Sequence, residues 1–153
     1  MRSAKPRRGP FVAGEGDHSL ALMGAARAAL LANPRVAAFV GNRVYESVPS
    51  RIAWPYLTIS DGGGVAAFSS EYEGDDLAFE IHVWSRHTNG TSSECRLICA
   101  AVQAALHDAD LDLGSGAALS SLARRSRRTF RDPDNLTWHG VVVFEARVET
   151  SED

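Results

Sequence analysis

The sequence has few of the features that mark the common functional classes. With only two cysteines it cannot be a disulfide scaffold, and no apolar run approaches the roughly 20 residues needed to cross a membrane. No apolar stretch of a signal peptide follows the basic start of the chain. Lys5 is the only lysine among the 16 basic residues, which together with the abundant alanine indicates a GC-rich coding bias. We expect a protein that is made in a reducing compartment.

Motifs for catalysis and cofactor binding are also missing. The chain contains no nucleophile elbow, phosphate loop, dinucleotide fingerprint or zinc-ligand spacing. No lysine or helix follows Gly62-Gly63-Gly64, so a flexible loop is favoured over a phosphate cradle. Glu80 and His82 share one face of a predicted strand and could form an acid–base pair. Nothing else in the sequence converges on them, so a solvated or subunit-facing pair is favoured. We expect no enzyme, no cofactor and no metal.

What the sequence does contain is enough apolar residues for one folded domain. The chain has 153 residues, of which 44% are hydrophobic, and a formal net charge of −3. This composition is typical of a soluble globular protein, and the small net charge argues against a surface built entirely for nucleic acid. We predict a flexible basic extension over residues 1–16, because arginines there alternate with proline and glycine, and a single domain over residues 17–150.

The order of the predicted elements indicates an α+β fold. Helices are expected from Asp17 or Ser19 to about Ala32 and from Thr91 to about His107, and strands over 44–48, 56–60, 77–86, 119–131 and 137–150. This pattern predicts a mostly antiparallel sheet of about four to five strands with two main helices packed on one face. A turn is expected at 132–135, between the last two strands.

The second predicted helix carries both cysteines. Thr91 and Glu94 have the spacing of a capping box, in which each side chain satisfies a free backbone amide at the helix start. Cys95 and Cys99 are four residues apart and therefore share a helix face. Free cysteines in this arrangement usually pack as small buried hydrophobes, and no further ligand completes a metal site.

Arginines cluster on the strand predicted over 119–131. They are Arg124, Arg125, Arg127, Arg128 and Arg131. Simple alternation places three of them on one face (Arg125, Arg127 and Arg131) and two on the other, with Leu122 and Phe130 pointing inward. The cluster can be a solvated edge strand protected from aggregation, a phosphate-binding surface, or a salt-bridged protein interface.

An acidic segment on the same chain favours the interface. Its carboxylates are Glu71, Glu73, Asp75 and Asp76. They end a segment, residues 62–76, that is predicted to be a long loop, and long loops in compact domains are often functional. The residues expected to dock this loop on a partner are Gly62, Gly63, Gly64, Phe68 and Tyr72. Two complementary patches on one chain suit a head-to-tail ring, in which each copy offers one patch to each neighbour.

Several short segments, taken in order and spacing, carry a family resemblance. They are NPRVAAFVGNRVY (33–45), PYLTI (55–59), EIHVWSR (80–86), AALH (104–107), RDPD (131–134) and HGVVVF (139–144). Over residues 18–149 the chain resembles the tail terminator, or tail completion, family of long-tailed bacteriophages and gene transfer agents. Two features depart from the family pattern: the basic extension, and Asn135 where the turn often has glycine.

The resemblance implies a structural virion protein without enzymatic activity. Family members form a hexameric ring that caps the completed tail tube and ends its polymerisation. The implied partners are further copies of the chain, the tail tube protein, and the connector or stopper protein of the head. DNA would only pass through the lumen, no membrane would be involved, and the protein would lie at the tail–head junction after assembly in the bacterial cytoplasm.

Two other functions stay open. One is a nucleic-acid-binding module that uses the basic strand Arg124–Arg131 together with the basic extension. The other is a head-closure, or stopper, protein of the same virion.

Overall fold

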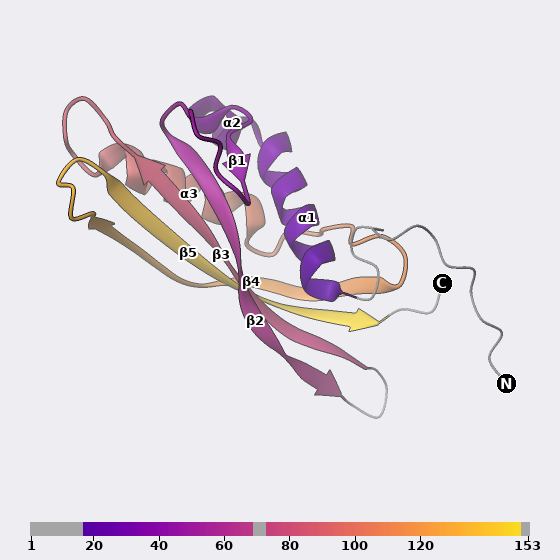
Figure 1. Cartoon of the computed structure of the whole chain (residues 1–153). Helices are drawn as coiled ribbons and strands as arrows, with labels where there is room; N and C mark the ends of the chain where they lie inside the picture. The colour runs from indigo at the N-terminus through magenta and orange to yellow at the C-terminus, as the bar shows by residue number, and fades with distance from the viewer. Residues whose placement is uncertain (1–16, 69–72, 151–153) are drawn as a thin grey trace, which may run out of the picture.

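The computed structural model describes residues 17–68 and 73–150 of the chain. Within them the helices are α1 (His18–Ala32), α2 (Pro34–Val40) and α3 (Ser93–Leu106), and the strands are β1 (Val44–Tyr45), β2 (Tyr56–Phe68), β3 (Glu73–Ser85), β4 (Ala117–Arg131) and β5 (Trp138–Thr150). Figure 1 shows their arrangement. The extension predicted over residues 1–16 lies outside the described residues.

The five strands form one sheet in the spatial order β1-β2-β3-β5-β4. In the described part of the chain β1 and β2 are parallel, and the other neighbouring strands are antiparallel. The helices all lie over one face of the sheet (Figure 1). We call this the covered face and the opposite one the open face. The prediction of an α+β fold with a mostly antiparallel sheet is confirmed.

The first two helices begin and end at local capping signals. The Asp17 side chain accepts a hydrogen bond from the Leu20 amide at 3.1 Å, which confirms the predicted start of α1. Asn33 ends α1 and caps α2, where its side chain accepts from the amides of Arg35 and Val36. Pro34 is the first residue of α2, a position at which its missing N–H costs nothing.

The capping box predicted for α3 is wrong. The N-cap is Ser92, which makes no side-chain capping hydrogen bond. Glu94 instead accepts a hydrogen bond from the hydroxyl of Ser85 on β3, at 2.7 Å. Ser85 is fully buried, and a buried hydroxyl without an acceptor would be destabilising. The Glu94 carboxylate therefore ties α3 to the sheet.

The core lies between the helices and the covered face. The rings of Phe79 and Phe144, from the neighbouring strands β3 and β5, stack with their centroids 5.2 Å apart. Cys95 and Cys99 are free thiols and fully buried in this core, which confirms their predicted packing. They lie above Gly140 of β5, where a Cβ atom would meet both sulfurs. Helix and sheet approach each other closely at this point.

The loop predicted over residues 62–76 is mostly strand. β2 continues to Phe68, β3 begins at Glu73, and these two residues are partners in the ladder. A register shift between Asp61 and Gly64 absorbs the glycine run. Glycine and acidic residues have low strand propensity, but here β3 is hydrogen-bonded on both sides, to β2 and to β5. Only residues 69–72, including Glu71 and Tyr72, lie outside the described residues of this hairpin.

Candidate functional site

The two ends of the sheet carry opposite charges. β4 is the outermost strand at one edge and holds the arginine cluster. At the other edge β1 pairs only with Leu57 and Thr58 among the described residues of β2, so the distal part of β2 is itself an edge. This distal part and the start of β3 form what we call the acidic hairpin, residues 60–78. Figure 1 shows it projecting away from the helices.

Strand β4 does not divide its arginines between the two faces as predicted. Residues opposite each other in a ladder share a face. Arg127 lies opposite the core residue Val142, on the covered face, whereas Arg128 lies opposite Val141, on the open face. A bulge between Arg124 and Ser126 inserts one residue and reverses the alternation expected from the sequence.

The resulting sets of arginines differ from the predicted ones. The covered face carries Arg124, Arg127 and Arg131, and the open face carries Arg125 and Arg128. Phe130, predicted to point inward, lies opposite His139 on the open face. Leu122 is buried as predicted.

Few of these arginines have a carboxylate partner within the described part of the chain. Arg125 forms an ion pair with Glu145. Arg127 donates to the amide oxygen of Gln103 on α3 at 3.4 Å, and Arg128 lies over the ring of Phe130 at 5.2 Å. Arg131 donates to the backbone oxygen of Gly90 at 2.7 Å and lies over the ring of Trp138. The charge of the cluster is therefore largely uncompensated.

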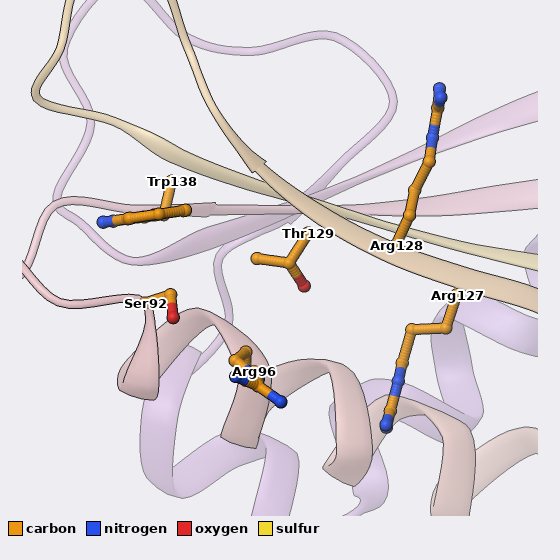
Figure 2. A pocket seen from close by; sticks show the side chains of 6 residues that line it. All are labelled: Ser92, Arg96, Arg127, Arg128, Thr129 and Trp138. Carbon is orange, nitrogen blue, oxygen red and sulfur yellow. The ribbon is translucent and has the colours of Figure 1, made fainter.

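A hollow of about 440 Å³ lies between β4 and the start of α3. Its lining residues are Ser92, Arg96, Arg127, Arg128, Thr129 and Trp138. Figure 2 shows Arg127 extending toward α3 and Arg128 extending away from it. We call this hollow the basic pocket.

Arg96 of the basic pocket was not singled out from the sequence. It lies on the same stripe of α3 as Ala100 and Gln103, and that stripe faces β4 through the Arg127–Gln103 contact. Arg96 is exposed, and its guanidinium makes no hydrogen bond or ion pair with the other described residues. The signal in the sequence was the break that Arg96 and Gln103 make in the apolar run of the helix after Glu94.

The predicted acidic residues of the hairpin are only partly free. Arg147 of β5 binds both carboxylate oxygens of Asp76, at 2.7 and 2.9 Å, and this hydrogen bonding lowers the pKa of Asp76. Asp75 accepts from His18 of α1 at 2.8 Å. Glu73 is exposed, and no other described residue pairs with its carboxylate.

The predicted docking residues Gly62, Gly63 and Gly64 line a second hollow, of about 650 Å³. It spreads across neighbouring strands at the base of the acidic hairpin and includes Ala123 and Arg147. Glycine is needed at position 64, where a Cβ would meet Leu77 and the Asp76 carbonyl oxygen. The glycine run therefore leaves this side of the hairpin without side chains that would fill the hollow.

The histidines His82 and His139 form a cluster on the open face that the sequence did not reveal. Glu80 and His82 are in contact at 3.0 Å, but contrary to expectation other groups converge on them. His82 Nδ1 lies 2.7 Å from His139 Nε2, and the ring of Trp84 stacks on His139 at 3.8 Å. Burial, and next the neighbouring His82, lower the pKa of His139. A neutral His139 can share one proton with His82, which fixes a rigid surface of imidazole and indole rings.

No group of three or more His, Cys, Asp or Glu side chains suitable for a metal ion occurs in residues 17–68 and 73–150. In the same ranges no helix is long and apolar enough to span a bilayer. What the described surface offers is charge of opposite sign at the two ends of the strands, together with two hollows. Both are properties of a surface that contacts other macromolecules.

Comparison with known proteins supports the same conclusion. The sequence matches the model of the family described as tail completion protein gp17 over residues 24–149. The fold is similar to a chain in a solved structure described as the virion of a native gene transfer agent (GTA) particle. That similarity has a TM-score of 0.76 and 29% sequence identity, and it covers 84% of this chain and 94% of that chain. No curated protein matches the sequence.

These matches confirm the resemblance drawn from the short sequence segments. The family match spans most of the chain, from the middle of α1 to the end of β5. The structural match is a similarity of sequence as well as of fold. The chain therefore belongs to the tail completion protein gp17 family and is a structural protein of the virion tail.

Proposed function

We propose that six copies of this chain form a ring that caps the completed tail tube, ends its polymerisation and joins the tail to the head. The observation that carries this proposal is the opposite charge at the two ends of the strands. At one end β4 presents Arg124, Arg127, Arg128 and Arg131, which lack carboxylate partners in the described chain, and at the other end the acidic hairpin presents Glu73. The count of six follows the family resemblance.

Opposite patches at opposite ends of the strands favour a closed ring over a two-fold dimer. A two-fold interface places the same patch against itself, which here would oppose like charges. A head-to-tail contact places the arginines of one copy against the hairpin of the next, and repetition of this contact closes a ring. Function then comes from geometry: a closed ring on the end of the tube leaves no site for another tube subunit.

The acidic hairpin is the element that we propose to dock on the neighbouring copy at the tube end. A chain that assembles only on the tube end avoids premature rings, and contacts that form on docking supply this control. The proposed docking residues remain Gly62, Gly63, Gly64, Phe68 and Tyr72, with Glu71, Glu73, Asp75 and Asp76 as the acidic set. DNA would cross the lumen without tight binding, so arginines suit subunit boundaries better than a lumen wall.

Electron microscopy of particles produced without this protein tests the proposal. We expect tails of uncontrolled length, or tails of normal length that are not joined to heads, and restoration when the intact gene is supplied in trans. Tails of normal length joined to heads in its absence would contradict the proposal. Short tails with open, DNA-leaking heads would instead support a stopper protein.

A nucleic-acid-binding module is the second candidate, because β4 is rich in arginine. Binding dominated by phosphate contacts weakens steeply as salt rises. A titration of the purified protein with duplex DNA at low and high salt measures this, and absence of binding at low salt removes the candidate. The split of the arginines between two faces of β4 already disfavours a continuous track along a phosphate backbone.

A further inference from the structure

We infer that the basic pocket is the receptor for the acidic hairpin of the neighbouring copy, with Arg96 and Arg127 binding its carboxylates. This inference rests on the proposed ring and names the contact that holds it. Arg96 comes from α3 and Arg127 from β4, and both line the same hollow of about 440 Å³. Figure 2 shows the two side chains on the α3 side of β4.

The pocket is positively charged and has no acid of its own. Three of its six lining residues are arginines, and none is Asp or Glu. The Arg127 guanidinium has only a long contact to the neutral Gln103, and the Arg96 guanidinium has no hydrogen-bond or ion-pair partner among the described residues. Two guanidinium groups that converge on one hollow repel each other, and an incoming carboxylate relieves this repulsion.

One wall of the pocket is held rigid. The indole N–H of Trp138 donates to the backbone oxygen of Gly90 at 3.0 Å, and Arg131 donates to the same oxygen. Arg131 also covers the Trp138 ring, 4.7 Å from its centroid. Aromatic and arginine side chains contribute most of the binding energy in many protein interfaces. Side chains that are already held in place lose little conformational freedom on binding.

The occupant is a second copy of this chain, because the chain itself carries the complementary element. The acidic hairpin projects from the end of the strands opposite to the pocket (Figure 1): its β3 residues pair with 145–149 of β5, whereas Arg127 pairs with Val142, so the hairpin cannot fold back into its own pocket. Glu73 lies at the start of β3, is exposed, and pairs with no other described residue. Contact of this hairpin with the basic pocket of the next copy repeats around a ring.

Nucleic acid fits the basic pocket less well. A phosphate backbone needs cations spaced along one continuous surface. Arg127 and Arg128 are neighbours in sequence but lie on opposite faces of β4, and Arg125 on the open face is already paired with Glu145. The described pocket concentrates its charge in one bounded hollow, which suits a small number of carboxylates.

The test uses charge reversal and its compensation in a strain that lacks the native gene. The socket variant carries Arg96→Glu and Arg127→Glu, and the compensated variant adds Glu73→Arg. The matched control carries Arg35→Glu and Arg51→Glu, two exposed arginines away from the pocket. The readout is the fraction of tails that are joined to heads, counted by electron microscopy, and circular dichroism of each purified variant checks its fold.

We expect the socket variant to lower the joined fraction about tenfold or more, because loss of a charge pair at an interface costs a few kcal/mol and each 1.4 kcal/mol is a factor of ten. The compensated variant should regain at least about threefold, and the control should match the parent. The milder pair Arg96→Gln and Arg127→Gln should reduce joining in the same direction and replaces the socket variant if reversal prevents folding.

Deletion of the gene tests the capping function, and the socket variant tests the pocket contact separately. If deletion of the gene disturbs tails but the folded socket variant joins them normally, the pocket is not the contact, although the capping function stands. Loss of joining without any recovery by Glu73→Arg would show that the hairpin is not the occupant. Duplex DNA binding by the parent that the socket variant abolishes would overturn the inference in favour of a phosphate ligand.

Discussion

Gly140 lies where α3 and the sheet approach each other closely. A Cβ there would meet the sulfur of Cys99, the sulfur of Cys95 at 3.1 Å and the Cβ of Val83 at 3.3 Å. These atoms are buried and packed on all sides, so added volume has nowhere to go.

Substitution of Gly140 by alanine should therefore destabilise the protein. Gly140→Ala is expected to lower the free energy of unfolding by roughly 1–3 kcal/mol, as overpacking of a core usually does. The matched control is Gly24→Ala in α1, where no atom lies within 4 Å of the added Cβ. It should raise stability by up to about 1 kcal/mol, because alanine favours the helix. Urea unfolding of both variants gives the comparison, and unchanged or higher stability of Gly140→Ala would contradict this packing.

At the scale of single residues the sequence predicted which side chains are buried better than it predicted their hydrogen-bond partners. The spacing of Cys95 and Cys99 was enough to predict their shared buried face, because helical period alone determines it. The partner of Glu94 could not be predicted in the same way. Its carboxylate satisfies Ser85 from a different element, and that hydroxyl competes with the local capping box. The cluster of His82 and His139 could not be predicted for the same reason, because β3 and β5 bring together two residues that are 57 positions apart in the sequence.

At the scale of elements the acidic hairpin shows where local propensity fails. Its glycines and acids predict a loop, but β3 is paired on both sides and β2 follows it. Gly74 fits because its missing side chain allows close approach to Val148 and Glu149 of β5. Strand pairing over long sequence distances decided the outcome, and single-sequence propensity does not contain it.

Shortening of the hairpin should separate folding from capping. Val65 and Asp76 are direct partners in the ladder, so a two-residue Asn-Gly turn can replace residues 66–75 between them. We expect the shortened chain to fold, because none of the replaced residues with described side chains, Ala66 and 73–75, belongs to the buried apolar core. It should leave tails uncapped, since Glu73 and the proposed docking residues Phe68 and Tyr72 are removed.

Two measurements check the shortened variant. Thermal unfolding of the purified chain should remain cooperative, and electron microscopy of complemented particles should show the same tail defect as deletion of the gene. Normal capping by a chain without the hairpin tip would contradict its role in docking. The matched control keeps residues 66–75 and replaces only 88–89, an exposed turn before α3, by Asn-Gly.

The bulge in β4 is the second element that the sequence did not reveal. The run from Arg124 to Arg131 was correctly predicted to be a strand, but its alternation was read without an inserted residue. The register shift between Arg124 and Ser126 exchanges faces, so that Arg127 turns toward α3. Without this bulge the basic pocket would lose one of its two central arginines.

At the scale of the whole molecule the arrangement of the strands determines where the charges lie. Composition shows only a weakly acidic chain with a net charge of −3. In the sheet of order β1-β2-β3-β5-β4 the acidic hairpin and the arginines of β4 lie at opposite ends of the strands, because the hairpin pairs with 145–149 of β5 and the arginines pair with 138–144. The near-neutral total is thus the sum of two opposed patches. The fold class and the helix-covered face could be predicted from the sequence, whereas the strand order could not.

Symmetry connects this monomer to a function in the tail. A single domain with an acidic patch at one end of its strands and a basic patch at the other needs no further part to build a closed ring. Membership of the tail completion family provides the setting, and the basic pocket with the acidic hairpin provides the proposed contact.

The most direct test of this account is a cryo-electron microscopy reconstruction of the tail–head junction in intact particles. We predict six copies of this chain in one ring at the end of the tail tube, with the acidic hairpin of each copy seated between Arg96 and Arg127 of the next. A ring in which β4 faces solvent or the lumen, or a position of the chain away from the tube end, would contradict it.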